Sequence, residues 1–125
     1  MPRKKVMELA WLDDVEAHDF DAAASYLALV YSDKRCTKAV AALRAAPLSR
    51  FKAKDIFRAS GLSLLGVSNY HVEKDRHKIQ TGTPLSPLLL VREPDLGKVI
   101  VADGYHRLCA VYGFDEDAWI PCRIA

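Results

Sequence analysis

The sequence lacks the features that would place it in a membrane, in a disulfide framework or on a polyanion. No uninterrupted apolar run approaches the roughly 20 residues of a membrane-spanning helix, and no signal-peptide core follows the N-terminal basic residues. The three cysteines are an odd number without C-x-x-C spacing, which favours reduced, buried thiols. The formal net charge is only +2, which is not typical of a dedicated nucleic-acid binder. We therefore expect a soluble cytoplasmic protein with no membrane partner.

The composition is that of an ordinary globular domain. Half of the 125 residues are hydrophobic and 27% are charged, close to the averages of soluble domains. This length is sufficient for one hydrophobic core without metal or disulfide staples. We expect a single domain over residues 1–125, with a helical part over 1–47 and a second part over 48–125. The basic residues 2–5 are expected to be a solvated end.

The N-terminal part is expected to form a helical hairpin. Apolar residues recur at helical spacing over residues 20–31, and Asp19 and Asp21 are placed to cap the start of that helix. A second amphipathic run covers residues 34–46 and stops at Pro47. Neither helix carries a pattern of reactive groups. We therefore interpret this part as a scaffold.

Two further helices are predicted after the hairpin. Residues 52–60 suit a short helix ended by Gly61 as its C-cap. The polar stretch 71–79 suits a surface helix that packs through its two apolar residues, Val72 and Ile79. This second helix matters for function because its other residues are mostly charged.

The last third of the chain is typical of buried strands. Short apolar runs over residues 85–91 and 99–102 are bounded by turn residues, and the stretch 93–98 between them has hairpin length. A third strand is predicted over 119–124. The apolar run 62–67 fits either a turn of buried chain or a short strand. We expect the first two strands to be neighbours in one sheet.

The last predicted helix and strand contain a glycine and a proline that bear on their structure. Residues 105–112 are predicted to form a helix with Gly113 as its C-cap. Pro121 lies within the last predicted strand, and a proline there suits an edge strand. Only two residues separate the predicted strand 99–102 from the predicted helix 105–112.

The clearest functional signal lies at that junction. Where Asp103 and Gly104 join strand to helix, the next three amides should be first-turn donors without intrahelical acceptors. Those amides and the helix dipole favour an anion. Gly104 permits a close approach or a positive φ, Arg107 can fork onto phosphate oxygens, and His106 can donate a further hydrogen bond. Asp103 either orients Arg107 or caps an ordinary helix whose His106 and Arg107 form a solvated face.

Residues 103–110, Asp-Gly-Tyr-His-Arg-Leu-Cys-Ala, resemble the D-G-x-H-R-x-x-A signature of the ParB/sulfiredoxin superfamily. The polar stretch 71–79, the glycine after it and the run 85–91 are similar to that family's polar helix, glycine and strand. The resemblance implies an α+β fold in which the N-terminal helical hairpin packs on a small mixed sheet with flanking helices. It also implies a nucleotide or phosphate group held by the motif loop.

The resemblance carries over to individual residues. The loop residues that would hold the ligand are Gly104, Tyr105, His106 and Arg107, with Asp103 beside them. By position in the polar helix, His71, Lys74 or Lys78 would supply a further phosphate contact. The candidate ligands are ATP, ADP or CTP with Mg²⁺, or another small phosphorylated molecule.

Departures from the family pattern narrow the function. Tyr105 stands where sulfiredoxins place their reactive cysteine, so sulfinic-acid reduction is not expected. No helix-turn-helix module follows the motif, so sequence-specific DNA clamping is not expected either. Cys109 is expected to be a buried thiol. The acidic run 115–117 is expected to be a solvated turn, so no metal site is predicted.

Three hypotheses follow. The leading one is a nucleotide- or phosphate-binding protein of the ParB/sulfiredoxin-like type, with catalysis left open. The second is a protein-interaction module that retains the fold without a ligand, and the third is a nuclease or DNA-associated protein. A phosphoryl transfer would need a carboxylate base, and the residues alone do not choose among Glu73, Asp75 and Asp103. No oligomeric state is predicted.

Overall fold

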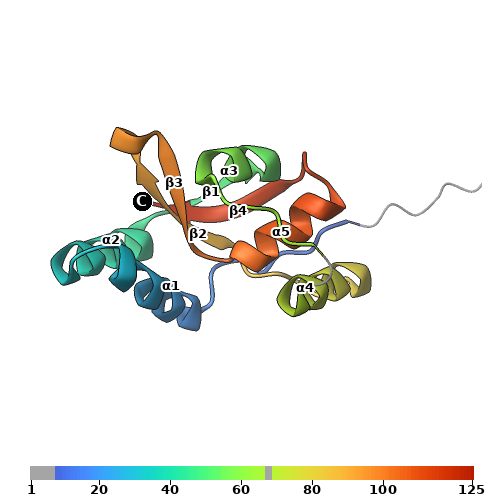
Figure 1. Cartoon of the computed structure of the whole chain (residues 1–125). Coiled ribbons are helices and arrows are strands. Elements are labelled where there is room, and N and C mark those ends of the chain that lie inside the picture. The colour runs from blue at the N-terminus through green and yellow to red at the C-terminus, as the bar shows by residue number, and fades with distance from the viewer. Residues whose placement is uncertain (1–7, 67–68) are drawn as a thin grey trace, which may run out of the picture.

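A computed structural model describes residues 8–66 and 69–125 of the protein. Those residues form five α-helices and one four-stranded mixed sheet, which confirms the predicted α+β class. The predicted solvated end at residues 2–5 lies outside the described residues. The elements follow one another in Figure 1 as α1 (Ala17–Val30), α2 (Asp33–Ala45), β1 (Leu48–Lys52), α3 (Ala53–Ser60), α4 (Tyr70–Thr81), β2 (Leu88–Glu93), the short 3-10 helix η1 (Pro94–Leu96), β3 (Lys98–Asp103), α5 (Tyr105–Phe114) and β4 (Trp119–Ile124).

The sheet joins two antiparallel pairs through one parallel contact. Its strand order is β1-β4-β2-β3, with β1 antiparallel to β4 and β2 antiparallel to β3. The central strands β2 and β4 are parallel. The predicted hairpin of the two apolar runs is confirmed, and η1 provides its turn. This topology places the end of β3, where the predicted anion loop begins, at one edge of the sheet.

Helices cover both faces of the sheet (Figure 1) because the central strand β2 is apolar on both sides. Alternate residues of a strand point to opposite faces, and here Leu88 and Leu90 belong to one core while Leu89 and Val91 belong to the other. The helices α1 and α2 bury residues against the second of these faces, and α3, α4 and α5 bury residues against the first. None of the helices within the described ranges is long and apolar enough to cross a membrane.

Helix α1 begins three residues earlier than the periodicity predicts. Glu16 is its N-cap, and the buried Asp19 carboxylate accepts a hydrogen bond from the Glu16 N–H at 3.2 Å. Asp19 therefore does cap the helix start, from the third helical position. The cap predicted at Asp21 is wrong, because Asp21 is exposed and lies inside the helix.

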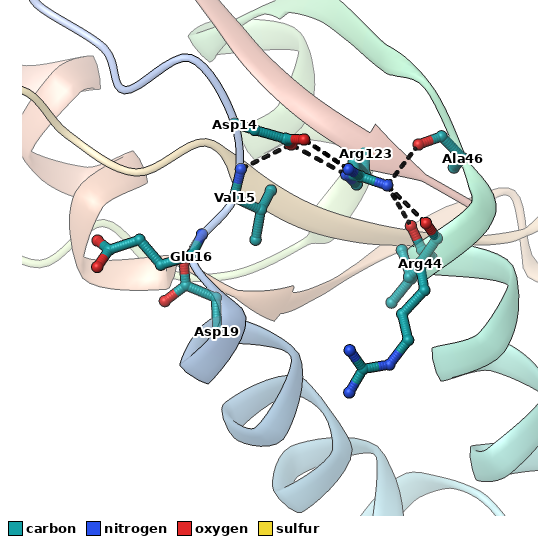
Figure 2. A network of polar contacts seen from close by, with 8 residues as sticks. Asp14, Val15, Glu16, Asp19, Arg44, Ala46 and Arg123 are labelled. Atoms are coloured by element: carbon teal, nitrogen blue, oxygen red, sulfur yellow. Dashed lines mark hydrogen bonds and ion pairs between the residues drawn. The ribbon is translucent and has the colours of Figure 1, made fainter.

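The first two helices are held to the sheet by Arg123 of β4 (Figure 2). Its guanidinium donates to both carboxylate oxygens of Asp14, at 3.1 and 2.6 Å. The same side chain donates to the backbone carbonyls of Leu43, Arg44 and Ala46 at the end of α2, at 3.5, 2.7 and 2.9 Å. The last carbonyls of a helix have no intrahelical partner, so Arg123 satisfies the end of α2 and joins it to the chain before α1.

Strand β1 and the loop after α3 differ from the predicted elements. Lys52 belongs to β1, which was not predicted, and α3 starts one residue later. Residues 62–66 form neither the buried turn nor the strand that their apolar character suggested, because only Leu65 among them is partly buried. Val67 lies outside the described residues. Gly61 adopts a positive φ of 66° at the C-cap of α3, as predicted.

Two predictions about the last elements are wrong. Gly113 is not the C-cap of α5, because the Asp115 N–H donates to the Val111 carbonyl at 2.8 Å and extends the helix to Phe114. The strand that holds Pro121 is not an edge strand, since β4 lies between β1 and β2. The pairing of β4 with β2 begins at Cys122, so the missing N–H of Pro121 lies outside that ladder.

Candidate anion-binding site

A polar hollow of about 220 Å³ lies between α4 and the start of α5. Both helices cover the same face of the sheet and pack against each other (Figure 1). The structure brings together on its walls the eight residues that the sequence proposes as ligand contacts, and with them Asp75, one of the three candidate carboxylate bases. Helix α4 contributes His71, Lys74, Asp75 and Lys78, and the loop at the end of β3 contributes Asp103, Gly104, Tyr105, His106 and Arg107.

Gly104 makes the sharp change of direction between β3 and α5. Its φ is +104°, a conformation that side chains strongly disfavour. A Cβ at this position would lie 2.8 Å from Leu88 Cγ and 2.9 Å from Arg107 Nη2. The Arg107 guanidinium can therefore fold back over the loop only because residue 104 has no side chain.

The first turn of α5 leaves its amides free. The first intrahelical bond of α5 runs from the Leu108 N–H to the Gly104 carbonyl at 2.9 Å. The N–H groups of Tyr105, His106 and Arg107 donate to no acceptor within residues 8–66 and 69–125. No side chain caps the helix either. The alternative in which Asp103 caps an ordinary helix is therefore wrong.

Asp103 instead orients Arg107. Arg107 Nη2 donates to Asp103 Oδ2 at 3.0 Å and to the Pro87 carbonyl at 3.4 Å. The Arg107 Nε atom is buried and has no partner in the described part of the chain. A guanidinium carries five N–H donors, so this arrangement leaves donors of Arg107 available to a ligand. Burial raises the pKa of Asp103, and the Arg107 charge opposes that rise.

Two histidines form the opposite corner of the hollow. The rings of His71 and His106 lie 4.8 Å apart between centroids, inclined at 38°. Burial, followed by repulsion from His71, lowers the pKa of His106. An anion in the hollow would favour the protonated imidazole instead, because an adjacent negative charge stabilises the cationic form.

Asp75 is the site residue that the sequence named only as one of three equivalent candidate carboxylates. It is only 9% exposed, and its open side lines the hollow. Burial raises its pKa, opposed chiefly by Arg107 and Lys78. The signal that would have identified it is its spacing from Val72 and Ile79, three and four residues away, which places Asp75 on the buried side of α4.

A second hollow, of about 450 Å³, is larger but offers little charge chemistry. It lies on the other flank of α4 and is lined mainly by apolar side chains, with Arg76 as its only charged residue. Cys109 lines it and is 1% exposed, which confirms the predicted buried thiol. We therefore assign polar recognition to the smaller hollow.

The acidic turn after α5 plays no part in either hollow. Residues 115–117 are exposed, as predicted, and Asp117 pairs with Lys54 at 2.6 Å. In the portion of the chain that the structure covers, no three histidine, cysteine or acidic side chains gather in a metal-binding group.

The arrangement suits a small anion. The three residues with free helix amides, Arg107 among them, and the lysines of α4 line one hollow. Hydrogen bonds to a charged group are stronger than neutral ones. Comparison of the chain with protein-family models, with curated proteins and with solved structures gives no match.

Proposed function

We propose that the protein binds a nucleotide or another small phosphorylated ligand through the hollow between α4 and α5, in a ParB/sulfiredoxin-like fold. One observation carries the proposal: the three residues with unbonded amides at the start of α5 line the same cavity as the cations Lys74 and Lys78. A phosphate presents several strong acceptor oxygens and a negative charge. It therefore matches both the donors and the sign of the field.

The order of elements supports the fold half of the proposal. The polar helix α4, a glycine with φ of +71°, the strand β2 and the motif loop follow one another as the family resemblance implies. In the motif loop, Gly104 adopts a positive φ and the Arg107 guanidinium lies close to it. Both features favour a loop shaped around an anion.

The size of the hollow limits how much of the ligand it encloses. Pockets for drug-sized ligands measure roughly 300–1,000 Å³, whereas this hollow is about 220 Å³. It has room for a phosphate and a few further atoms. If the ligand is a nucleotide, its base lies outside the walls described above.

A thermal-shift experiment tests the proposal. Inorganic phosphate, ATP, ADP, CTP and GTP would be added with and without Mg²⁺ to the wild type and to Arg107→Met. A ligand at ten times its Kd stabilises the folded state by about 1.4 kcal/mol, enough to raise the Tm by several degrees. We expect that rise in the wild type and its loss in Arg107→Met.

Arg58→Met is the matched control, because Arg58 is a highly exposed cation of α3 whose loss changes the net charge equally. It should respond to ligand as the wild type does. A wild type that no ligand stabilises at about millimolar concentration would contradict the proposal and favour the interaction module. Metal-dependent cleavage of plasmid or single-stranded DNA would favour the nuclease hypothesis instead.

A further inference from the structure

Asp75 is a carboxylate in a hollow that otherwise attracts anions. Its charged neighbours around the cavity are Lys74 and Lys78 of the same helix and His106 and Arg107 of α5. Asp75 nevertheless forms no ion pair within 4.0 Å and no side-chain hydrogen bond in the residues that the structure describes. Buried polar groups normally have a partner. An acceptor without a partner on the wall of a ligand cavity therefore points to a donor on the ligand.

The other two candidate carboxylates are excluded by their surroundings. Asp103 is already occupied by Arg107, whose Nη2 donates to it at 3.0 Å. Glu73 does not line the hollow, and its half-exposed carboxylate lies 3.9 Å from Arg76 on the surface of α4. Asp75 is thus the carboxylate among the three that is both directed into the cavity and unoccupied.

We infer that Asp75 accepts a hydrogen bond from a hydroxyl group of the ligand, so that the site selects phosphate esters that carry a free hydroxyl close to the phosphate. This inference rests on the proposed phosphate binding. A carboxylate repels a bare phosphate, so its presence is unfavourable unless the same ligand also offers a donor. A site built to bond a hydroxyl also discriminates strongly against the analogue that lacks it, since its polar group is then left unpaired.

Isothermal titration calorimetry with two matched esters tests the inference. Glycerol 3-phosphate carries hydroxyls on a three-carbon chain, and n-propyl phosphate is the same chain without them. We expect the wild type to prefer glycerol 3-phosphate by about tenfold or more, the range of a hydrogen bond to a charged group. Asp75→Ala should lose the preference and should bind n-propyl phosphate more tightly than the wild type does, because a repelling charge is gone.

Glu73→Ala is the control, because it removes a carboxylate from the same helix outside the hollow. It should keep the preference of the wild type. Asp75→Asn keeps the shape of the side chain and one neutral acceptor oxygen, so it should show a reduced preference even if Asp75→Ala folds poorly.

The outcomes separate the two proposals. Equal binding of both esters by the wild type overturns the inference and leaves the proposed function standing. Binding of neither ester overturns the inference, and the proposed function also fails only if inorganic phosphate and the nucleotides do not bind. A preference that survives in Asp75→Ala also overturns the inference. The same holds if Mg²⁺ strengthens the binding of both esters equally and only when Asp75 is present, because the carboxylate would then act through the cation.

Discussion

Two arginines of this protein are equally covered but differ in what they bond. The side chains of Arg123 and Arg107 are 18% and 17% exposed. Arg123 donates five hydrogen bonds, to Asp14 and to three carbonyls at the end of α2 (Figure 2). Arg107 donates two, both from Nη2, and its Nε has no partner among the described residues. The two arginines therefore differ in bonding and not in burial, and the donors of Arg107 that lack a partner support its proposed role in binding.

The two clusters, each formed by one of these arginines and the groups it bonds, also differ in the sequence separation of their members. Arg123 contacts segments 77 to 109 residues away and joins β4 to the first two helices. Arg107 contacts Asp103, one helical turn earlier, and the Pro87 carbonyl, 20 residues earlier. The Arg123 cluster joins separate parts of the fold, and the Arg107 cluster forms a local surface on which donors have no partner. Substitutions at Arg123 should therefore reduce stability, and substitutions at Arg107 should reduce ligand binding.

The largest expected effect comes from closing the space under Arg107. Gly104→Ala places a Cβ 2.8 Å from Leu88 Cγ and 2.9 Å from Arg107 Nη2, at a φ of +104°. Overpacking and backbone strain together should lower the free energy of unfolding by about 3 kcal/mol, as measured by urea denaturation. Gly82→Ala is the control, with a φ of +71° and open space around it. An equal loss in both variants would show that the contact with Arg107 is unimportant.

The next largest loss of stability is expected from substitution of Arg123, the arginine with five hydrogen bonds. Arg123→Met keeps the apolar stem but leaves Asp14 and three carbonyls without their donor. We expect a loss of about 2 kcal/mol in the free energy of unfolding and no change in the affinity for inorganic phosphate. Arg92→Met removes the same charge from an exposed position of β2 and should change stability little. Weaker phosphate binding in Arg123→Met would break the separation between the two clusters.

At Arg107 we expect the opposite result, a small loss of stability and a large loss of phosphate affinity. Arg107→Met should lower the free energy of unfolding by about 1 kcal/mol, because it loses one partly buried pair and a long carbonyl contact. Its affinity for inorganic phosphate should fall about tenfold or more. Calorimetry and urea denaturation of the same preparation give both numbers. A stability loss as large as that of Arg123→Met would assign Arg107 a structural role instead.

The smallest effects, of opposite sign, are expected from pH. The hydrogen bond from Arg123 lowers the pKa of Asp14 below its ordinary value of 3.8. The stability that Asp14 contributes is therefore present above about pH 4 and is lost as the pH falls through its folded pKa. Burial raises the pKa of Asp75 above the same ordinary value. Asp75 therefore reduces stability as the pH rises from about 4 through its folded pKa.

Urea denaturation between about pH 3 and pH 7 separates the two carboxylates. Asp14→Asn should weaken the loss of stability below pH 4. Asp75→Asn should be more stable than the wild type at neutral pH, since it removes a charge that the hollow desolvates. A less stable Asp75→Asn at neutral pH would show that the carboxylate stabilises the free protein and is not reserved for a ligand.

Local sequence was sufficient to predict the loop that forms the centre of the site. The change from apolar strand to helix at Gly104, and the donors of the next three residues, depend on backbone preferences within one turn. The glycine C-cap at Gly61 and the packing of α4 through Val72 and Ile79 are local in the same sense. Gly113 failed as a cap because an available glycine does not end a helix whose next N–H still finds an acceptor.

Only the tertiary structure decided which side chains meet. From the sequence alone, Glu73, Asp75 and Asp103 were equivalent carboxylates, and packing of α4 against α5 directed Asp75 into the hollow while Arg107 occupied Asp103. Arg123 showed no signal, because its partners come from segments that approach β4 only in the folded chain. Neighbouring residues determine backbone conformation through short-range sterics, whereas partners distant in sequence are selected by the packing of the whole core.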